Sequence, residues 1–213
     1  MVKKPEYTNG HELSQSCSLC ELPDLSLSEK EAQIAYHFGE IMQLLGLDLS
    51  DPSLRDTPKR VAKMYLHELF RGLDPQKVPQ VRLFPNTYAY NQMVVEKDIR
   101  VHSVCEHHFV PIIGVAHIGY IPHDFVVGLS KLNRIVDYFA RRPQVQERLT
   151  QQIADFLESQ LHTPDIAVVI DAKHYCVSMR GIQDEASRTL TYAFRGAFNE
   201  KETKDTFLRL VGL

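Results

Sequence analysis

Residues 166–175 form an apolar segment rich in β-branched side chains, and this feature most constrains the fold because it predicts a strand. Residues 98–105 alternate at the strand period, and residues 110–121 are again rich in β-branched and aromatic side chains. Residues 189–194 suggest one more strand. The sequence therefore predicts two strands before and two strands after a central segment.

The central segment predicts two amphipathic helices. Ser130 can cap the first helix, which carries apolar residues at helical spacing, and Pro143 opens the second. A short helix at about residues 200–211 closes the chain. The expected order of strands and helices in this body is ββααββ.

Residues 28–72 predict an antiparallel helical hairpin ahead of this body. Ser28 and Glu31 match a capping box at the start of its first helix. Thr57 and Pro58 match the N-cap and the first position of its second helix. Residues 1–27 are polar and show no sustained period, so they predict a flexible N-terminal tail.

Charge and hydropathy exclude some classes of partner. The chain has 213 residues, with 24 Lys+Arg against 27 Asp+Glu and a net charge of −3. This balance argues against nucleic acid as the main partner, although it leaves room for a local basic pocket. No apolar run approaches the roughly 18–20 residues that a membrane span needs. We expect a cytoplasmic protein that binds neither nucleic acid nor membrane.

Cysteine and histidine residues gather in two short motifs that predict a metal site. Cys105 and His108 are three residues apart, so a thiolate and an imidazole can chelate one ion from a turn. On a strand, His174 and Cys176 would project from one face, so Cys176 can supply a third ligand while His174 stays beside the metal. These donors favour zinc, and three protein ligands leave a position for water, as in catalytic zinc sites. The alternative is a buried thiol beside surface histidines.

His107 and His174 are imidazoles that the three-ligand site leaves unused. Near a zinc-bound water they are natural proton donors and acceptors at neutral pH. The alternative for each is a structural role.

Basic residues in the same half of the chain predict an anion site. Lys131 and Arg134 lie on one stripe of the first central helix, whose N-terminal N–H groups beside Ser130 suit a phosphate. Arg180 follows the second metal motif and can reach the same pocket. Glu147, in the next helix, can accept hydrogen bonds from a donor-rich base. The alternatives are a solvated basic face and, for Glu147, compensation of the helix dipole.

Four separated motifs resemble those of the GTP cyclohydrolase I family and occur in the family's order. They are residues 103–108, 128–131, 142–150 and 174–176 followed by 180–181, within a resemblance that covers about residues 29–211. The resemblance implies an α+β tunnelling fold, an antiparallel four-stranded sheet with two helices on one face, preceded by the helical hairpin. Residues 90–213 would form the catalytic domain. A homodecamer of two stacked pentamers with shared active sites is also implied.

The reaction that the resemblance implies converts GTP and water into formate and 7,8-dihydroneopterin triphosphate, the first step of tetrahydrofolate and pterin biosynthesis. Zinc-bound water attacks C8 of the purine, the imidazole ring opens and formate leaves. The ribose then rearranges and a pterin ring closes.

The resemblance also assigns roles to residues. The ligands of one zinc ion per subunit would be Cys105, His108 and Cys176. The residues that move protons or assist the ribose rearrangement would be His107, His174 and Ser130. The residues that read guanine would be Glu147 and Gln146. The residues that hold the triphosphate would be Lys131, Arg134 and Arg180, with Arg60 and Lys63 from a neighbouring subunit.

Two residues depart from the family pattern. Tyr192 stands where a small residue is expected, and Arg195 stands where an apolar or small residue is usual. These departures bear on local packing near the pocket and not on the chemistry.

Two other functions fit parts of the sequence. A deazaguanine nitrile reductase on the same fold would use a Cys nucleophile and no three-ligand zinc set. A non-catalytic zinc protein would close a four-cysteine site with Cys17, Cys20, Cys105 and Cys176, leaving His108 unligated. For Cys17 and Cys20 alone, two surface thiols are the favoured interpretation, because a CxxC motif without a second pair is a weak signal.

Overall fold

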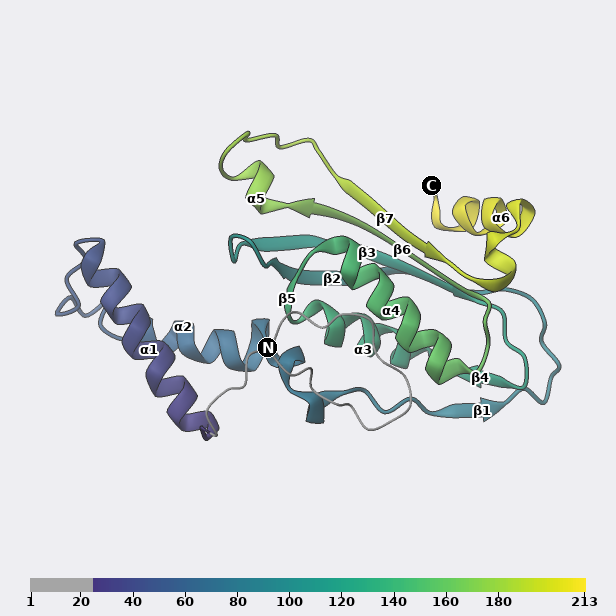
Figure 1. The fold of residues 1–213 in the computed structure, drawn as a ribbon, viewed down its shortest axis with the longest axis horizontal. Helices are drawn as coiled ribbons and strands as arrows, with labels where there is room; N and C mark the ends of the chain where they lie inside the picture. The colour runs from purple at the N-terminus through teal and green to yellow at the C-terminus, as the bar shows by residue number, and fades with distance from the viewer. Residues whose placement is uncertain (1–24) are drawn as a thin grey trace, which may run out of the picture.

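The computed structural model describes residues 25–213, whose arrangement is shown in Figure 1. The strands are β1 (Leu83–Pro85), β2 (Val94–Cys105), β3 (Pro111–Tyr120), β4 (Phe125–Val127), β5 (Pro143–Gln144), β6 (Ile166–His174) and β7 (Thr189–Phe194). The α-helices are α1 (Leu27–Leu44), α2 (Thr57–Met64), α3 (Leu129–Ala140), α4 (Gln146–Leu161), α5 (Tyr175–Ser178) and α6 (Lys201–Val211). The short helical turns are η1 (Tyr65–Leu69), η2 (Arg71–Leu73), η3 (Pro75–Lys77) and η4 (Gly196–Asn199).

The main sheet has the strand order β5-β2-β3-β6-β7. Its four long strands pair antiparallel, and the two-residue strand β5 runs parallel to the end of β2. Helices α3 and α4 cover one face of the sheet (Figure 1). The predicted α+β fold is therefore confirmed, including the order ββααββ and the preceding helical hairpin. Strands β1, β4 and β5 were not expected, because two or three residues are too few to show a period.

Apolar side chains that alternate along the strands bury both faces of the sheet. On the helix-covered face, Ile112 of β3 and Ile170 of β6 share one buried cluster with Leu132 of α3 and Ile153 of α4. Fully burying an aliphatic side chain of this size stabilises the fold by about 1.5–3 kcal/mol. On the other face, a smaller cluster joins β6 to η4 and α6. This double-sided burial holds the first half of β6, and the strand ends at the predicted site residue His174.

The N-cap of α1 is Ser26, so the prediction of Ser28 was wrong. The Ser26 hydroxyl accepts a hydrogen bond from the Glu29 backbone N–H, and the Glu29 carboxylate accepts one from the Ser26 N–H at 2.8 Å. Both Ser26 with Glu29 and Ser28 with Glu31 match the capping-box pattern, so the pattern alone does not choose between them.

The two central helices also begin at other residues than predicted. Gly128 is the N-cap of α3, which leaves Ser130 exposed in the first turn rather than capping the helix. Pro143 does not open α4, because it pairs with Val104 in strand β5. Helix α4 begins at Gln146 instead. This short strand ties the start of α4 to the end of β2.

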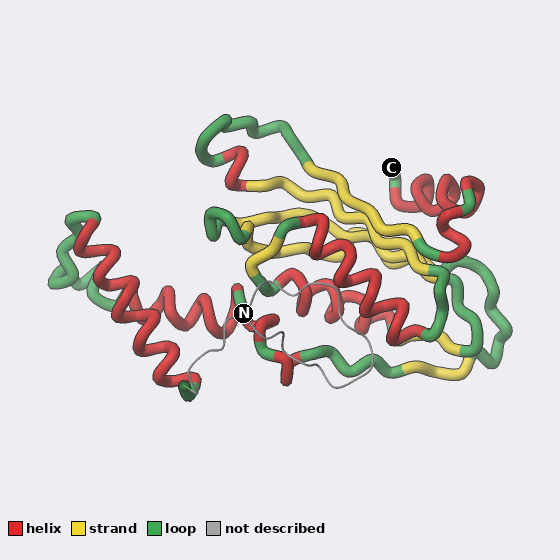
Figure 2. The backbone as a smooth tube through the Cα atoms, viewed as in Figure 1, coloured by secondary structure: helices red, strands yellow, loops and turns green. Residues whose placement is uncertain are grey.

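Helices α1 and α2 pack against each other and extend to one side of the sheet (Figure 2). Several apolar side chains of this hairpin are exposed, among them Tyr36, Ile41, Leu44 and Leu45. Leu44 is 88% exposed, an unusually large exposure for a leucine side chain. In the described part of the chain, no helix combines the length and the apolar character needed to cross a membrane.

Candidate active site

Cys105, His108 and Cys176 form a group that can hold a metal ion. Their ligand atoms all lie within 4.8 Å of one another. Cys105 ends β2 and is buried, His108 lies in the exposed loop that follows, and Cys176 lies in α5. Residues far apart in the sequence thus converge because β2 and β6 are both neighbours of β3.

Backbone hydrogen bonds fix the loop that carries Cys105 and His108. The Cys105 N–H donates to the Val110 carbonyl at 2.8 Å, and the Phe109 N–H donates to the Cys105 carbonyl at 2.8 Å. The Glu106 N–H donates to the Gln144 carbonyl of β5 at 3.1 Å. The loop is therefore held by its own backbone and by the neighbouring strand.

Cys176 does not lie on a strand, so the argument that His174 and Cys176 project from one strand face was wrong. Strand β6 ends at His174, and the chain turns at once into the single helical turn α5. The Met179 N–H donates to the Tyr175 carbonyl at 3.0 Å and closes this turn. The helical turn, rather than the pleat of a strand, directs Cys176 toward Cys105.

The donor set suits a soft or borderline cation. Zinc prefers thiolate and imidazole ligands, whereas magnesium and calcium prefer oxygen ligands. Burial raises the pKa of the Cys176 thiol, and the neighbouring Cys105 raises it further. A bound cation would offset the repulsion between two thiolates, so the residues present fit a metal.

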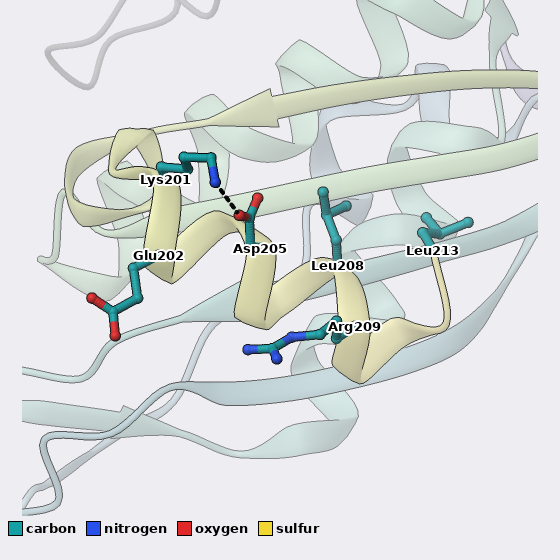
Figure 3. Close-up of a pocket in the computed structure, with 6 residues that line it drawn as sticks. All are labelled: Lys201, Glu202, Asp205, Leu208, Arg209 and Leu213. Carbon is teal, nitrogen blue, oxygen red and sulfur yellow. Dashed lines mark ion pairs between the residues drawn. The ribbon is translucent and has the colours of Figure 1, made fainter.

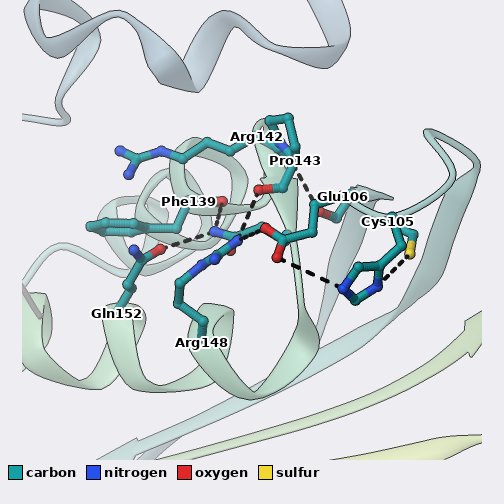
Figure 4. Close-up of polar contacts among 10 residues, drawn as sticks. Cys105, Glu106, Phe139, Arg142, Pro143, Arg148 and Gln152 are labelled. Atoms are coloured by element: carbon teal, nitrogen blue, oxygen red, sulfur yellow. Dashed lines mark hydrogen bonds and ion pairs between the residues drawn. The ribbon is translucent and has the colours of Figure 1, made fainter. Parts of the chain in front are cut away.

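His107 contacts Cys105 and Glu106, two residues of the polar network that Figure 4 shows. Its Nδ1 lies 3.8 Å from Cys105 Sγ, and its Nε2 lies 4.0 Å from Glu106 Oε1. The Glu106 carboxylate pairs with the Arg148 guanidinium, whose Nε donates to Gln144 Oε1 at 3.0 Å. Helix α4 therefore contacts the metal loop through Arg148, a residue that the sequence did not single out.

His174 is half-buried at the end of β6, directly before the turn with Cys176. Its Nε2 lies 2.7 Å from Gln146 Oε1 at the start of α4. Burial lowers the pKa of His174, and the nearby Glu147 carboxylate partly opposes this shift. Glu147 itself is exposed.

Arg180 also reaches the metal cluster. Its Nη1 lies 3.1 Å from His108 Nε2, which brings a permanent positive charge beside the ligand set. One end of the sheet thus carries the metal cluster together with His107, His174, Glu147 and Arg180.

Another part of the fold carries the predicted site residues Ser130, Lys131 and Arg134. The side chain of Asn133, next to Arg134 on α3, donates to Glu96 Oε1 at 3.1 Å near the start of β2. Cys105 is at the other end of that strand, which at about 3.3 Å per residue is about 30 Å away. Within one chain, Lys131 and Arg134 therefore lie near the opposite end of β2 from the metal cluster.

Lys131 and Arg134 line a hollow of about 490 Å³ between α3 and the connector of residues 71–80. Arg71 and Lys77 of this connector line it too, and they are cations that the sequence analysis missed. The Gly72 N–H donates to the Arg141 carbonyl at 2.9 Å, and a Cβ on Gly72 would lie 2.1 Å from the Tyr138 carbonyl oxygen. Only glycine lets the connector approach α3 so closely.

Arg60 and Lys63 are exposed on α2. Arg60 Nη2 donates to Thr57 Oγ1 at 2.7 Å and to the Ser53 carbonyl at 3.0 Å, so it is held within the hairpin. Within residues 25–213, Arg60 and Lys63 form no hydrogen bond or ion pair with the metal cluster of their own chain.

Another hollow, of about 660 Å³, lies along α6 (Figure 3). It contains the exposed ion pair between Lys201 and Asp205, at 3.3 Å. None of the predicted site residues lines it.

Of the two departures from the family pattern, Tyr192 points away from the site and Arg195 stabilises the fold. Tyr192 is 67% exposed and stacks on Phe194, on the sheet face opposite to that of Thr191. Arg195 forms ion pairs with Asp155 and Glu158 of α4. These contacts raise the pKa of Arg195 against the opposing effect of burial, so the charge is kept.

Comparisons with known proteins give one consistent answer. Residues 34–212 match the family model described as GTP cyclohydrolase I. GTP cyclohydrolase 1 of Flavobacterium johnsoniae is 52% identical over 190 residues, which cover 89% of this chain and 85% of the relative. GTP cyclohydrolase 1 of Salmonella gallinarum is 52% identical over 191 residues, which cover 89% of this chain and 86% of the relative.

A solved structure of the archaeosine synthase QueF-Like overlaps 47% of this chain and 90% of its own, with a TM-score of 0.40 and 18% identity. A likeness this weak does not bear on function. Cys17 and Cys20, which the four-cysteine alternative needs, lie outside the described residues. The family match and the relatives support the main interpretation over both alternatives, and the chain belongs to the GTP cyclohydrolase I family.

Proposed function

We propose that this chain converts GTP and water into formate and 7,8-dihydroneopterin triphosphate, the first step toward tetrahydrofolate and pterins. The observation that carries the proposal is the convergence of Cys105, His108 and Cys176, with His174 beside them, in a chain of this family. The test is incubation of the purified protein with GTP, followed by assays for formate and for a fluorescent pterin after oxidation. We expect equal amounts of both products, and a metal-loaded protein that releases no formate would contradict the proposal.

The metal that we propose is zinc, one ion per chain, held by Cys105, His108 and Cys176. Zinc at this site would act as a Lewis acid and make hydroxide available at neutral pH. The mutual distances within the group support one shared ion.

Proton transfer is assigned to His107 and His174. Opening the imidazole ring of GTP and releasing formate require protons to move to and from nitrogen and oxygen atoms. Imidazole side chains do this well at neutral pH. His107 is adjacent in sequence to one ligand and His174 lies two residues from another, which supports both assignments.

Glu147 is assigned to the guanine base. Guanine presents N1–H and the exocyclic amine as two donors on one edge, and a carboxylate can accept both. Adenine has an acceptor at N1 and no amine at C2, so the same carboxylate would face a lone pair. The exposure of Glu147 and its proximity to His174 support this assignment.

Glu147→Gln is expected to lower kcat/KM for GTP at least about tenfold, because hydrogen bonds to charged groups are worth roughly 1.5–3 kcal/mol. The amide of the new glutamine would place an N–H donor against an N–H donor of guanine. Steady-state kinetics with GTP measure the loss, and zinc content should stay unchanged. Glu202→Gln is the matched control, because Glu202 is also an acidic residue in the first turn of a helix. Equal, small effects of both changes would return Glu147 to dipole compensation.

The triphosphate is assigned to Lys131, Arg134 and Arg180, and Ser130 to the ribose rearrangement. Lys131 and Arg134 line a polar hollow in which Arg71 is paired with Asp137, and their own two charges support an anionic occupant. Arg180 lies beside the metal cluster of its own chain. Because Ser130, Lys131 and Arg134 lie far from that cluster, one GTP molecule would need two chains to contact both groups.

We propose a homodecamer of two stacked pentamers with shared active sites, in which Arg60 and Lys63 reach the triphosphate from a neighbouring subunit. The exposed apolar side chains of α1 support burial of the hairpin in an assembly. Strand β7 ends the sheet and can pair with another copy.

Mixing a Lys131→Ala chain with a His174→Ala chain is expected to restore activity that each variant lacks alone. In symmetric oligomers mixed one to one, about a quarter of sites built from two chains would be intact. Formate release after refolding the mixture measures this. A mixture of His174→Ala with Cys176→Ala is the control, because both residues come from one chain and no intact site can form. No recovery in confirmed mixed oligomers of the first pair would contradict shared sites.

We assign the protein to the cytoplasm. Thiol ligands keep their metal-binding form in a reducing compartment, which supports this assignment.

A further inference from the structure

The side-chain amide of Gln146 is almost fully buried, with 1% of the residue exposed, and it connects three elements of the fold. Its nitrogen lies 3.0 Å from the Ile170 carbonyl oxygen of β6 and 2.8 Å from the Thr189 carbonyl oxygen of β7. It also lies 3.1 Å from Thr191 Oγ1. Its oxygen lies 2.7 Å from His174 Nε2.

The two carbonyl oxygens fix which way the amide of Gln146 faces. A backbone carbonyl can only accept, so the side-chain atom next to Ile170 and Thr189 must be the NH₂ group. The opposite orientation would place oxygen against two oxygens and leave the amide donors unused, which is costly for a buried group. The Gln146 oxygen therefore faces His174.

Two threonine hydroxyls agree with this orientation. Thr150 Oγ1 donates to the Gln146 backbone carbonyl at 2.8 Å. The hydroxyls of Thr150 and Thr191 lie 2.7 Å apart, and since the Thr150 proton is already used, Thr191 donates to Thr150. The Thr191 oxygen is then free to accept from the Gln146 NH₂ group. Each donor in the group has an acceptor.

An amide oxygen can only accept, so the ring nitrogen of His174 that faces it must carry a proton. We propose that Gln146 is a positioning residue that fixes the neutral tautomer of His174 with its proton on Nε2, leaving the lone pair on Nδ1. Nδ1 is then the ring nitrogen that can accept a hydrogen bond. The catalytic meaning of this tautomer rests on the proposed function, whereas the tautomer itself does not.

This inference gives Gln146 a different role from reading guanine. Both ends of its amide are engaged by residues of its own chain, and the side chain is buried. Glu147, which is exposed next to it, is left to contact the base.

The ¹⁵N spectrum of the metal-loaded protein, labelled at histidine, tests the tautomer directly. Magic-angle spinning makes the measurement independent of assembly size, and comparison with His174→Ala identifies the signals of His174. At mildly alkaline pH we expect a protonated Nε2 and an unprotonated Nδ1. The opposite pattern would overturn the proposal, whether or not the protein acts on GTP.

Gln146→Met tests the positioning role by kinetics, because methionine keeps the length of the side chain and removes its polar atoms. We expect kcat to fall about 10- to 100-fold, the usual cost of losing the partner that orients a functional imidazole. KM for GTP and zinc content should stay unchanged. Gln151→Met, at an exposed position of the same helix, is the matched control. A variant with unchanged kcat and a raised KM would overturn the proposal in favour of guanine recognition.

The variant spectrum separates positioning from folding. In folded Gln146→Met protein, His174 has lost its acceptor, so its signals should shift toward a mixture of the two tautomers. If the variant does not fold, the spectrum of the parent protein still decides the question. If the parent protein shows the expected tautomer but releases no formate, the proposed function fails and the tautomer assignment stands.

Discussion

Cys176→Ala protein is expected to bind no zinc and to release no formate from GTP. Three side chains whose ligand atoms lie within 4.8 Å of one another would hold the ion, and loss of one thiolate leaves only the Cys105 and His108 pair. Two ligands from one turn do not make a closed or a catalytic zinc site. Metal analysis of the purified protein and a formate assay measure both losses, and Cys105→Ala should behave in the same way.

The double variant Cys17→Ala with Cys20→Ala is the control for this result. Under the three-ligand interpretation it should keep its zinc and nearly all of its activity. Loss of zinc in the double variant would contradict that interpretation and support the four-cysteine site. Circular dichroism of each variant separates loss of metal from loss of fold.

His174→Ala is expected to keep zinc and GTP binding and to lose turnover by about 10²–10⁴-fold, the usual contribution of a positioned general acid or base. His174 directly precedes the helical turn that carries Cys176, and in residues 25–213 it is not one of the three residues of the candidate metal group. Single-turnover kinetics with GTP and zinc analysis on the same sample measure the two properties separately.

A matched histidine variant checks that this loss is specific. His162 ends α4 with a left-handed backbone, at φ 53°, and is exposed. Asparagine also tolerates this backbone conformation, so the activity of His162→Asn protein should stay near that of the parent. Loss of zinc from His174→Ala would instead make His174 a ligand and contradict its assignment to proton transfer.

The sequence predicted the four long strands and the two central helices because each is long enough to show its period. Strand β7 was expected at residues 189–194 and occupies Thr189–Phe194. Strand β5 was missed because Pro143 next to a helix is the usual mark of a helix start, whereas here it pairs with the end of β2. Tertiary pairing of two residues leaves no signal in the local pattern.

The metal cluster was predictable because its ligands lie in short motifs, but its geometry was not. Spacing in the sequence suggested that Cys176 continues a strand, whereas the chain turns into α5 after His174. No glycine or proline marks this point, so the local pattern does not show where the strand ends.

The helical spacing of Lys131 and Arg134 could not predict where these residues lie relative to the metal cluster. Their helical stripe says which face of α3 they share, but not along which direction α3 crosses the sheet. The bond between Asn133 and Glu96 shows that this part of α3 lies near the start of β2. Only the three-dimensional fold shows that Lys131 and Arg134 lie near the opposite end of β2 from the metal cluster.

The loop between β2 and β3 has a consequence for how the protein matures. Three backbone hydrogen bonds, from the N–H groups of Cys105, Glu106 and Phe109, close it without using a ligand side chain. A zinc finger folds only when its ion arrives, whereas this loop is shaped beforehand by its own backbone. We therefore expect the chain to be able to fold before it acquires its ion. Metal supply, as well as protein synthesis, would then set how much active enzyme a cell contains.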